Sequence, residues 1–226
     1  MEAPQKRLVF YYDEVSPPVR SVLLTVAALG VKDRIEHEHV NLFAGDHLKS
    51  EFVKINPLHT VPVLCHGEEL TITDSHAILM YLCEMFAPEG DDLAVSDPVQ
   101  RAKVLNRLCF NNGFLFQRDA EVMRKIFRGQ ISHVCSSHTD PIAEMIDVLE
   151  QYLQRTKYVA EDHLTVADFS VVATVSTLNL ILPIDGDRWP RVHGWLETMR
   201  ALPYYAEANG VGLEKLRAKL CTKIDI

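Results

Sequence analysis

The N-terminal third of the chain alternates apolar runs of the strand type with amphipathic stretches of the helix type. Residues 8–12 (LVFYY) are apolar, aromatic and β-branched, which predicts a buried strand. Residues 17–29 carry apolar side chains at helical spacing, and Gly30 follows as a helix stop. The alternating residues 35–40 (IEHEHV) predict a half-exposed strand, and residues 46–54 predict a short helix.

The pattern then changes to a hairpin followed by a helix. Short apolar runs at residues 61–65 and 69–73 flank the sequence HGE, which predicts two antiparallel strands and a turn. Ser75 is expected to cap the next helix, whose buried face carries four apolar side chains. These four are Ile78, Leu79, Leu82 and Met85. The order βαβα followed by ββα predicts one parallel strand pair with a right-handed crossover and an antiparallel hairpin at the edge.

The second half of the chain contains no convincing strand pattern. Residues 87–96 (APEGDDLAVS) are rich in Pro, Gly and Asp, which indicates a linker. Helical patterns follow at residues 97–132, 141–154, 166–181, 189–200 and 213–221. We therefore predict a small α/β domain over residues 1–86, the linker, and an all-α domain over residues 97–226. The fold class is α/β plus all-α.

Charge and cysteine usage exclude several classes of protein. Lys and Arg number 23 against 31 Asp and Glu, a net charge of −8 without a basic tract, which disfavours nucleic-acid and anionic-membrane partners. The five cysteines are widely spaced and form no CxxC, which argues against a disulfide scaffold or a zinc site and for a reducing compartment. No secretory segment begins the chain, and the apolar residues 171–184 are too few to span a bilayer.

Three short segments carry candidate chemistry, and the first surrounds Ser16. This serine follows the first strand and precedes Pro17, so it lies at the N-terminus of the first helix. Free N–H groups and the helix dipole favour an anion there, and a serine hydroxyl can stabilise a thiolate. Taken alone, the pattern favours a serine that only caps the helix.

The second segment, residues 56–64 (NPLHTVPVL), places Pro62 at the opening of a strand. A cis bond between Val61 and Pro62 would turn the backbone of Val61 outward, where an extended peptide can pair with it. His59 would then lie beside the carboxylate of that peptide. The alternative is a plain turn with an exposed histidine.

The third segment is the start of the helix after the hairpin, at Asp74 and Ser75. A cap hydroxyl and nearby amides can bind a carboxylate, while Asp74 supplies the opposite charge for an amine. An amino-acid head group carries both charges, although helix capping alone is the simpler alternative. The three segments together describe a groove for a tripeptide.

The sequences SPPVRS, NPLHTVPVL and TDSHAI resemble the thioredoxin-like half of cytosolic glutathione transferases, and the serine at the helix start resembles their insect delta/epsilon branch. In the second half, LTVAD resembles the family's capping box, a structural element in which Thr165 and Asp168 start a buried helix. YYDEVSPPVRS, FLFQRD, STLNLILP and GLEKLR are similar to the noppera-bo group of the epsilon class. The resemblance covers nearly the whole chain. It implies an N-terminal thioredoxin-like βαβαββα domain, a C-terminal helical bundle, glutathione binding and a role in ecdysteroid biosynthesis.

The resemblance also implies roles for individual residues. Ser16 would be the catalytic residue that stabilises the glutathione thiolate. The glutathione-binding residues would be His47, His59, Val61, Pro62, Asp74, Ser75, His76 and Arg118. A hydrophobic substrate pocket between the domains would be lined by Val15, Pro17, Leu42, Phe43, Phe116, Asp119, Ala120, Met123, Thr177 and Leu216. Glutathione is the implied co-substrate, and no metal is implied.

Among the predicted pocket residues, Asp119 says most about the chemical class of the ligand. An acceptor-only carboxylate in an apolar pocket would bind a donor such as a sterol hydroxyl. The alternative is an exposed helix on which Asp119 pairs with Arg118, Arg124 or solvent. The apolar stripe beside Asp119, formed by Phe116, Ala120 and Met123, is also typical of an ordinary core.

These features predict a glutathione S-transferase that activates the thiol of glutathione and binds a steroid-like ligand between its domains. Two alternatives stay open, a glutathione-dependent carrier of lipophiles and a general detoxifying transferase. Ser16→Ala separates the first from an enzyme, because a carrier keeps its activity without that hydroxyl. A thiol–disulfide oxidoreductase is disfavoured, since Ser16 stands where a cysteine is needed. The resemblance implies a homodimer, and the missing targeting segment and the free cysteines predict a cytoplasmic location.

Overall fold

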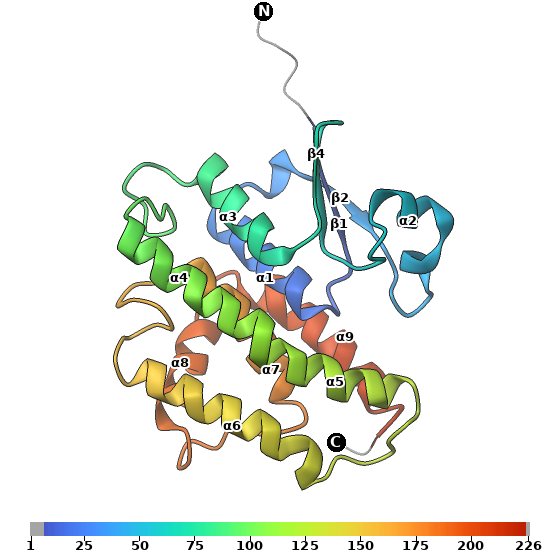
Figure 1. Cartoon of the computed structure of the whole chain (residues 1–226), viewed down its shortest axis with the longest axis vertical. Helices are drawn as coiled ribbons and strands as arrows, with labels where there is room; N and C mark the ends of the chain where they lie inside the picture. Colours follow the sequence, from blue (N-terminus) through green and yellow to red (C-terminus); the bar gives the residue numbers. More distant parts are fainter. Residues whose placement is uncertain (1–6, 225–226) are drawn as a thin grey trace, which may run out of the picture.

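The structure, a computed structural model, describes residues 7–224. A mixed α/β part lies above a bundle of helices in Figure 1, and the chain passes from one to the other after residue 86. Residues 87–97 form turns without a helix or strand. The architecture is the predicted thioredoxin-like domain followed by a helical domain.

A four-stranded sheet forms the centre of the α/β part. Its strands are β1 (Leu8–Tyr12), β2 (Glu36–His39), β3 (Val63–His66) and β4 (Leu70–Ile72). The order in the sheet is β2-β1-β3-β4, with β1 parallel to β2 and the other pairs antiparallel. This is the predicted topology, although each strand after β1 is one or two residues shorter than predicted; β3 starts only after Pro62, which has no N–H for a ladder.

Two longer helices pack in the α/β part. Helix α1 (Pro17–Ala28) ends before Gly30, which adopts a φ of +66° and so stops the helix as predicted. Helix α3 (Ser75–Phe86) buries Ile78, Leu79 and Leu82 completely. The prediction was wrong for Met85, which is 38% exposed because the helix reaches the surface there and Met85 borders a shallow hollow.

The predicted short helix at residues 46–54 is two pieces. A 3-10 turn, η2 (Asp46–Leu48), precedes helix α2 (Ser50–Ile55). Another 3-10 turn, η1 (Lys32–Arg34), leads into β2. Gly45, with a φ of +77°, opens η2, and this break brings His47 to the side of the sheet where β1 ends.

The helical part begins with one long rod. Helices α4 (Pro98–Phe110) and α5 (Phe116–Phe127) run on through a π-helical turn, η3 (Asn111–Leu115). The rod ends before Gly129 with a φ of +67°, five residues earlier than the amphipathic pattern predicts. The wider π turn changes which side chains of α5 face inward, and such turns occur often at functional sites.

The remaining helices form a bundle around α7 (Val166–Leu178). They are α6 (Ser136–Leu153), α8 (Pro190–Arg200), the π turn η4 (Ala206–Gly210) and α9 (Val211–Leu220). Every residue of α7 is buried, so this helix is the core of the bundle. Its first turn carries the capping box between Thr165 and Asp168, as predicted. Helix α1 packs directly against α7 and joins the two parts.

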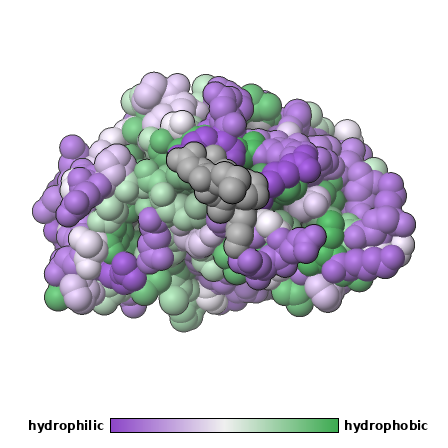
Figure 2. Space-filling view, turned by 90° about the horizontal axis from the view of Figure 1, so that it is seen from above, coloured by the Kyte–Doolittle hydropathy of each residue, from purple (hydrophilic) through white to green (hydrophobic). Residues whose placement is uncertain are grey.

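The surface seen from the α/β end is mostly polar, with apolar side chains gathered in patches between charged ones (Figure 2). None of the helices within residues 7–224 combines the length and the apolar character that crossing a bilayer requires.

Candidate functional site

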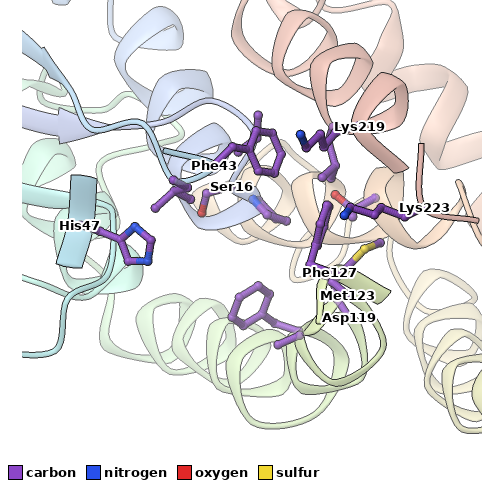
Figure 3. A pocket seen from close by; sticks show the side chains of 15 residues that line it. Ser16, Phe43, His47, Asp119, Met123, Phe127, Lys219 and Lys223 are labelled. Carbon is purple, nitrogen blue, oxygen red and sulfur yellow. The ribbon is translucent and has the colours of Figure 1, made fainter. Parts of the chain in front are cut away.

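Ser16 lies at the end of the loop between β1 and α1, directly before the first residue of α1. Its backbone has the extended conformation of a helix cap, and its N–H donates to Asp13 O over 3.0 Å. Its hydroxyl makes no capping hydrogen bond, so the capping alternative does not describe this side chain. The half-buried Oγ is free to donate to a ligand and faces the pocket between the two parts (Figure 3).

The start of α1 offers fewer donors than the sequence analysis expected. Pro17 and Pro18 occupy the first two helical positions, and proline has no N–H. The first free amide of α1 is therefore that of Val19. An anion at this end of α1 is stabilised by the Ser16 hydroxyl and by the helix dipole rather than by a set of amides.

Asp13 fixes the loop that carries Ser16. Its buried carboxylate accepts from Val15 N over 3.2 Å and from Leu42 N over 2.8 Å. The loop after β1 and the loop after β2 are thereby held together, with Val15 and Leu42 facing the same pocket. This role of Asp13 was not predicted, although an aspartate directly after a buried strand is a usable signal for it.

The turn before β3 is shaped by Asn56. Its side-chain amide donates to Thr60 O over 2.8 Å, and its Oδ1 accepts from Leu58 N over 3.0 Å. Between them His59 is exposed at a φ of +47°. The bond between Val61 and the buried Pro62 is cis. Neither the N–H nor the C=O of Val61 has a hydrogen-bond partner within residues 7–224, so both are available to an extended peptide.

His47, in η2, lines the same pocket as Ser16 (Figure 3). Its Nδ1 is buried and has no hydrogen-bond partner in the part of the chain that the structure describes. Burial lowers the pKa of His47, and the nearby His59 lowers it further. A ligand that brings an acceptor or a donor to Nδ1 would satisfy an atom that the fold leaves unpaired.

Helix α3 begins differently from the prediction. Asp74, not Ser75, is the cap, and its Oδ1 accepts from His76 N over 2.9 Å and from Ala77 N over 3.2 Å. Ser75 is the first helical residue, and its hydroxyl has no partner among the described residues. Asp74 Oδ2 lies 3.4 Å from the amide nitrogen of Asn112. An acid and a free hydroxyl are therefore side by side at this helix start.

Two predicted glutathione-binding residues lie differently. The ring of His76 points to the helical part, where its Nε2 lies 2.7 Å from Ser170 Oγ, so its side chain is engaged within the protein. Arg118 on α5 is half-buried with an unpartnered Nε, but it does not line the pocket. The residue of the helical part that lies next to Asp74 is Asn112. Both differences depend on how α3 meets the helical part, which local sequence does not determine.

One pocket of about 580 Å³ opens between the two parts (Figure 3). The structure brings all ten predicted pocket residues together around it, with Ser16 and His47 at one side. The ten are Val15, Pro17, Leu42, Phe43, Phe116, Asp119, Ala120, Met123, Thr177 and Leu216. Clefts of this size and apolar character are typical of small-molecule sites.

Three further residues line the pocket and were missed. Phe127 follows Met123 by four positions on α5, and its ring centroid lies 5.6 Å from that of Phe43. Lys219 and Lys223 follow Leu216 by three and seven positions. Helical spacing from known pocket residues was therefore a usable signal for all three.

Asp119 is buried in the pocket wall, with 3% of its surface exposed. Its Oδ1 has no hydrogen-bond partner within residues 7–224. Burial raises the pKa of this carboxyl to about 7, and the charge of Arg20 only partly opposes the effect. The alternative of an exposed helix face with Arg118 or Arg124 as partner is wrong.

The raised pKa also corrects the description of Asp119 as an acceptor-only group. At neutral pH a carboxyl with a pKa of about 7 is protonated in part of the molecules. It can then donate a hydrogen bond as well as accept one. Asp119 can therefore pair with a hydroxyl in either direction.

Two family models match this chain. A model of the glutathione S-transferase N-terminal domain matches residues 10–90, and a model of the C-terminal domain matches residues 117–198. Glutathione S-transferase 1 of Manduca sexta is 35% identical over 219 residues, which cover 96% of this chain and 99% of that protein.

Solved structures agree with these matches. An epsilon-class glutathione S-transferase from the housefly, Musca domestica, is 40% identical with a TM-score of 0.90, covering 97% of this chain and 100% of that chain. A glutathione transferase homologue from Drosophila mojavensis, solved with bound glutathione, is 35% identical with a TM-score of 0.88. The match covers 97% of this chain and 98% of that chain. The free hydroxyl at the start of α1 and the unpaired backbone at Val61 lie in the domain that the N-terminal model describes. The chain belongs to the glutathione S-transferase family, resembles the insect epsilon class within it, and is an enzyme with glutathione as co-substrate.

Proposed function

We propose that this transferase binds a hydroxylated, steroid-like lipophile between its two parts and acts on it with the thiolate of glutathione. The observation that carries the proposal is Asp119, a buried carboxyl whose Oδ1 is unpaired and which lies beside the apolar side chains of Phe116 and Met123 in the pocket wall. Such a group costs free energy unless a ligand supplies a hydrogen bond. Together with the resemblance to the noppera-bo group, this supports a role in ecdysteroid biosynthesis.

The glutathione side of the proposal uses the free polar groups around the end of β1. Ser16 Oγ donates to the thiolate, and the dipole at the start of α1 adds to the stabilisation. A thiol pKa lowered from about 9 to about 6–7 corresponds to roughly 3–4 kcal/mol, at about 1.36 kcal/mol for each unit. Val61 pairs with the peptide backbone of glutathione through its unpaired N–H and C=O.

The two ends of glutathione carry charge, and each has a suitable place. Ser75 and Asp74 hold the γ-glutamyl carboxylate and amine, because one offers a free hydroxyl and the other a negative charge. His47 and His59 approach the carboxylate of the glycyl end. This arrangement directs the thiol toward Ser16 and the pocket beyond it.

The lipophile lies against Phe116, Met123 and Phe127, and its hydroxyl meets Asp119. The thiolate of glutathione is then the nucleophile for an electrophilic carbon, or the base for a proton, at the end of the lipophile near Ser16. The protein's contribution is positioning of the two reactants and stabilisation of the thiolate.

The test is calorimetric titration with androst-5-ene-3β,17β-diol at saturating glutathione. We expect Asp119→Ala to weaken binding by about 0.5–3 kcal/mol, the range from a hydrogen bond to a neutral carboxyl to one with a charged carboxylate. Glu121→Ala on the same helix is the control, because Glu121 is exposed and pairs with Lys125 over 2.8 Å.

Equal binding by Asp119→Ala and the unaltered protein would refute the role of Asp119. Absence of steroid binding in a protein that binds glutathione would refute the steroid class, and a general detoxifying transferase would remain.

A further inference from the structure

The pocket has a charged side that the hydroxyl ligand does not use. Lys219 on α9 and Lys223 just after it line the pocket at the side away from His47 (Figure 3). Both side chains extend toward the space between Phe43 and Phe127. The pocket therefore combines an apolar wall with two ammonium groups.

Neither lysine is neutralised by a carboxylate within residues 7–224. Lys219 Nζ lies 5.3 Å from the ring centroid of Phe43, a cation–π contact at the edge of the pocket. By contrast, Lys215, one turn earlier on the same helix, is paired with Glu14. Within residues 7–224, neither of the two lysines that line the pocket has an acidic partner of this kind.

Asp119 does not fill that role. It is the acidic residue among those lining the pocket, but its charge is opposed by Arg20, and burial favours its protonated form. Among the described residues no carboxylate pairs with the two ammonium groups, which therefore present positive charge next to apolar surface. The chain as a whole carries a net charge of −8, so this local positive patch runs against the overall field of the protein.

We infer that the pocket selects lipophiles with an anionic group, a carboxylate or a sulfate, on an apolar body. The apolar body lies against the aromatic side chains, and the anion meets Lys219 and Lys223 at the mouth. The electrophilic carbon then lies toward Ser16. This inference rests on the proposed lipophile pocket and makes its substrate class more specific.

Ethacrynic acid and its methyl ester form a matched pair of probes, since they differ only in the anionic group and neither has a hydroxyl for Asp119. In both, the glutathione thiolate forms a bond to the terminal carbon of the enone. The carbon–carbon double bond is converted to an enolate, which takes a proton from water. The measured quantity is the ratio of kcat/KM for the acid to kcat/KM for the ester, corrected for the uncatalysed reaction.

We expect Lys219→Gln/Lys223→Gln to lower this ratio by about five- to tenfold, the effect of two exposed charge pairs. The control Lys103→Gln/Lys125→Gln removes the same charge from surface ion pairs outside the pocket, and the ratio should not change. Raising the salt concentration should lower the ratio of the unaltered protein, since screening weakens exposed charge pairs.

The same ratio in the lysine variant and the unaltered protein would overturn the inference. If neither probe is conjugated although 1-chloro-2,4-dinitrobenzene is, the affinities of the acid and the ester are measured by calorimetry instead. The same ratio of these two affinities in the lysine variant and the unaltered protein would then overturn the inference. A failed steroid titration at Asp119 would leave this result untouched, because the probes lack the hydroxyl.

Discussion

Asp168 and Asp119, two buried aspartates of the helical part, differ in whether their carboxyl oxygens have hydrogen-bond partners. Asp168 accepts from Val159 N, from Trp195 Nε1, and from the N–H and hydroxyl of Thr165, at 2.9–3.0 Å. Asp119 is as deeply buried, but its Oδ1 accepts from no group in the described chain. The first carboxylate holds the start of α7 in place, whereas the second has an oxygen atom that no described group satisfies.

At the residue scale we predict how Asp119 links stability to pH. Its folded-state pKa of about 7 lies above the value of about 3.9 for an unfolded aspartate. The folded protein therefore binds more protons between about pH 4 and about pH 7, and the free energy of unfolding falls as the pH rises through that range. Asp119→Asn does not titrate, so its stability relative to the unaltered protein should increase between about pH 4.5 and about pH 8 in urea unfolding.

Glu121→Gln serves as the control for this pH dependence. Lys125 lowers the pKa of the exposed Glu121, so the sign is reversed and its small stabilising effect is lost as the pH falls. A stability difference for Asp119→Asn that stays constant over the whole pH range would contradict the raised pKa.

At the element scale, the placement of α9 depends on a close approach of two backbones. A Cβ atom at Gly212 would lie 1.9 Å from the carbonyl oxygen of Glu14, in the loop that carries Ser16. Only glycine lets α9 pack this closely on the loop between β1 and α1. Leu216 and Lys219 reach the pocket from the next turns of the same helix.

We predict that Gly212→Ala lowers the free energy of unfolding by about 1–3 kcal/mol, because backbone must move to admit the methyl group. The loop with Ser16 moves as well, so kcat/KM for 1-chloro-2,4-dinitrobenzene should fall. Gly194→Ala in α8 is the matched control: its Cβ meets nothing within 4 Å, and the change should be neutral or stabilising by about 0.5–1 kcal/mol. Equal stabilities of the two variants would contradict the close approach.

At the scale of the whole molecule, Arg20 joins the two parts. It lies on α1 and is completely buried. Its guanidinium donates to Asn209 Oδ1 over 3.0 Å in η4, and to the hydroxyl of Thr177 and the carbonyl of Ala173 in α7. Burial lowers its pKa to about 10, so it stays charged at neutral pH. The same cation opposes the protonation of Asp119 across the interface.

We predict that Arg20→Met lowers the free energy of unfolding by about 3–5 kcal/mol, because buried acceptors lose their donor and Asp119 loses its opposing charge. Without the cation the pKa of Asp119 rises further, so the pH dependence of androstenediol binding moves to higher pH. Arg217→Met, an exposed residue paired with Glu214, should change stability by less than about 0.5 kcal/mol. An unchanged pH profile in Arg20→Met would show that the two groups do not interact.

Several whole-molecule predictions stay predictions. The homodimer, the cytoplasmic location and the domain limits at residues 86 and 97 were inferred from resemblance and composition. Sedimentation of the purified chain would test the homodimer directly. The role in ecdysteroid biosynthesis belongs to the same group until the steroid titration is made.

Much of the fold was predictable from local patterns of residues along the chain. The order of strands and helices, the stop at Gly30 and the capping box of α7 were predictable, because each depends on residues within one or two turns of one another. The apolar stripe of α5 likewise placed Phe116, Ala120 and Met123 on one face. The sequence motifs also indicated the family before any contact was known.

The remaining features were decided by contacts between distant residues. Three such features depend on how the helices pack, which a local stretch of sequence does not show. His76 contacts Ser170, Asp74 rather than Ser75 caps α3 beside Asn112, and Met85 is exposed. The availability of an atom is likewise a tertiary property. By itself the sequence determined which elements form and in what order, since that follows from short-range periodicity. Only the tertiary structure decided that Asp119 is buried without a partner and that Lys219 and Lys223 face the same pocket, because burial and pairing arise from packing across the whole chain.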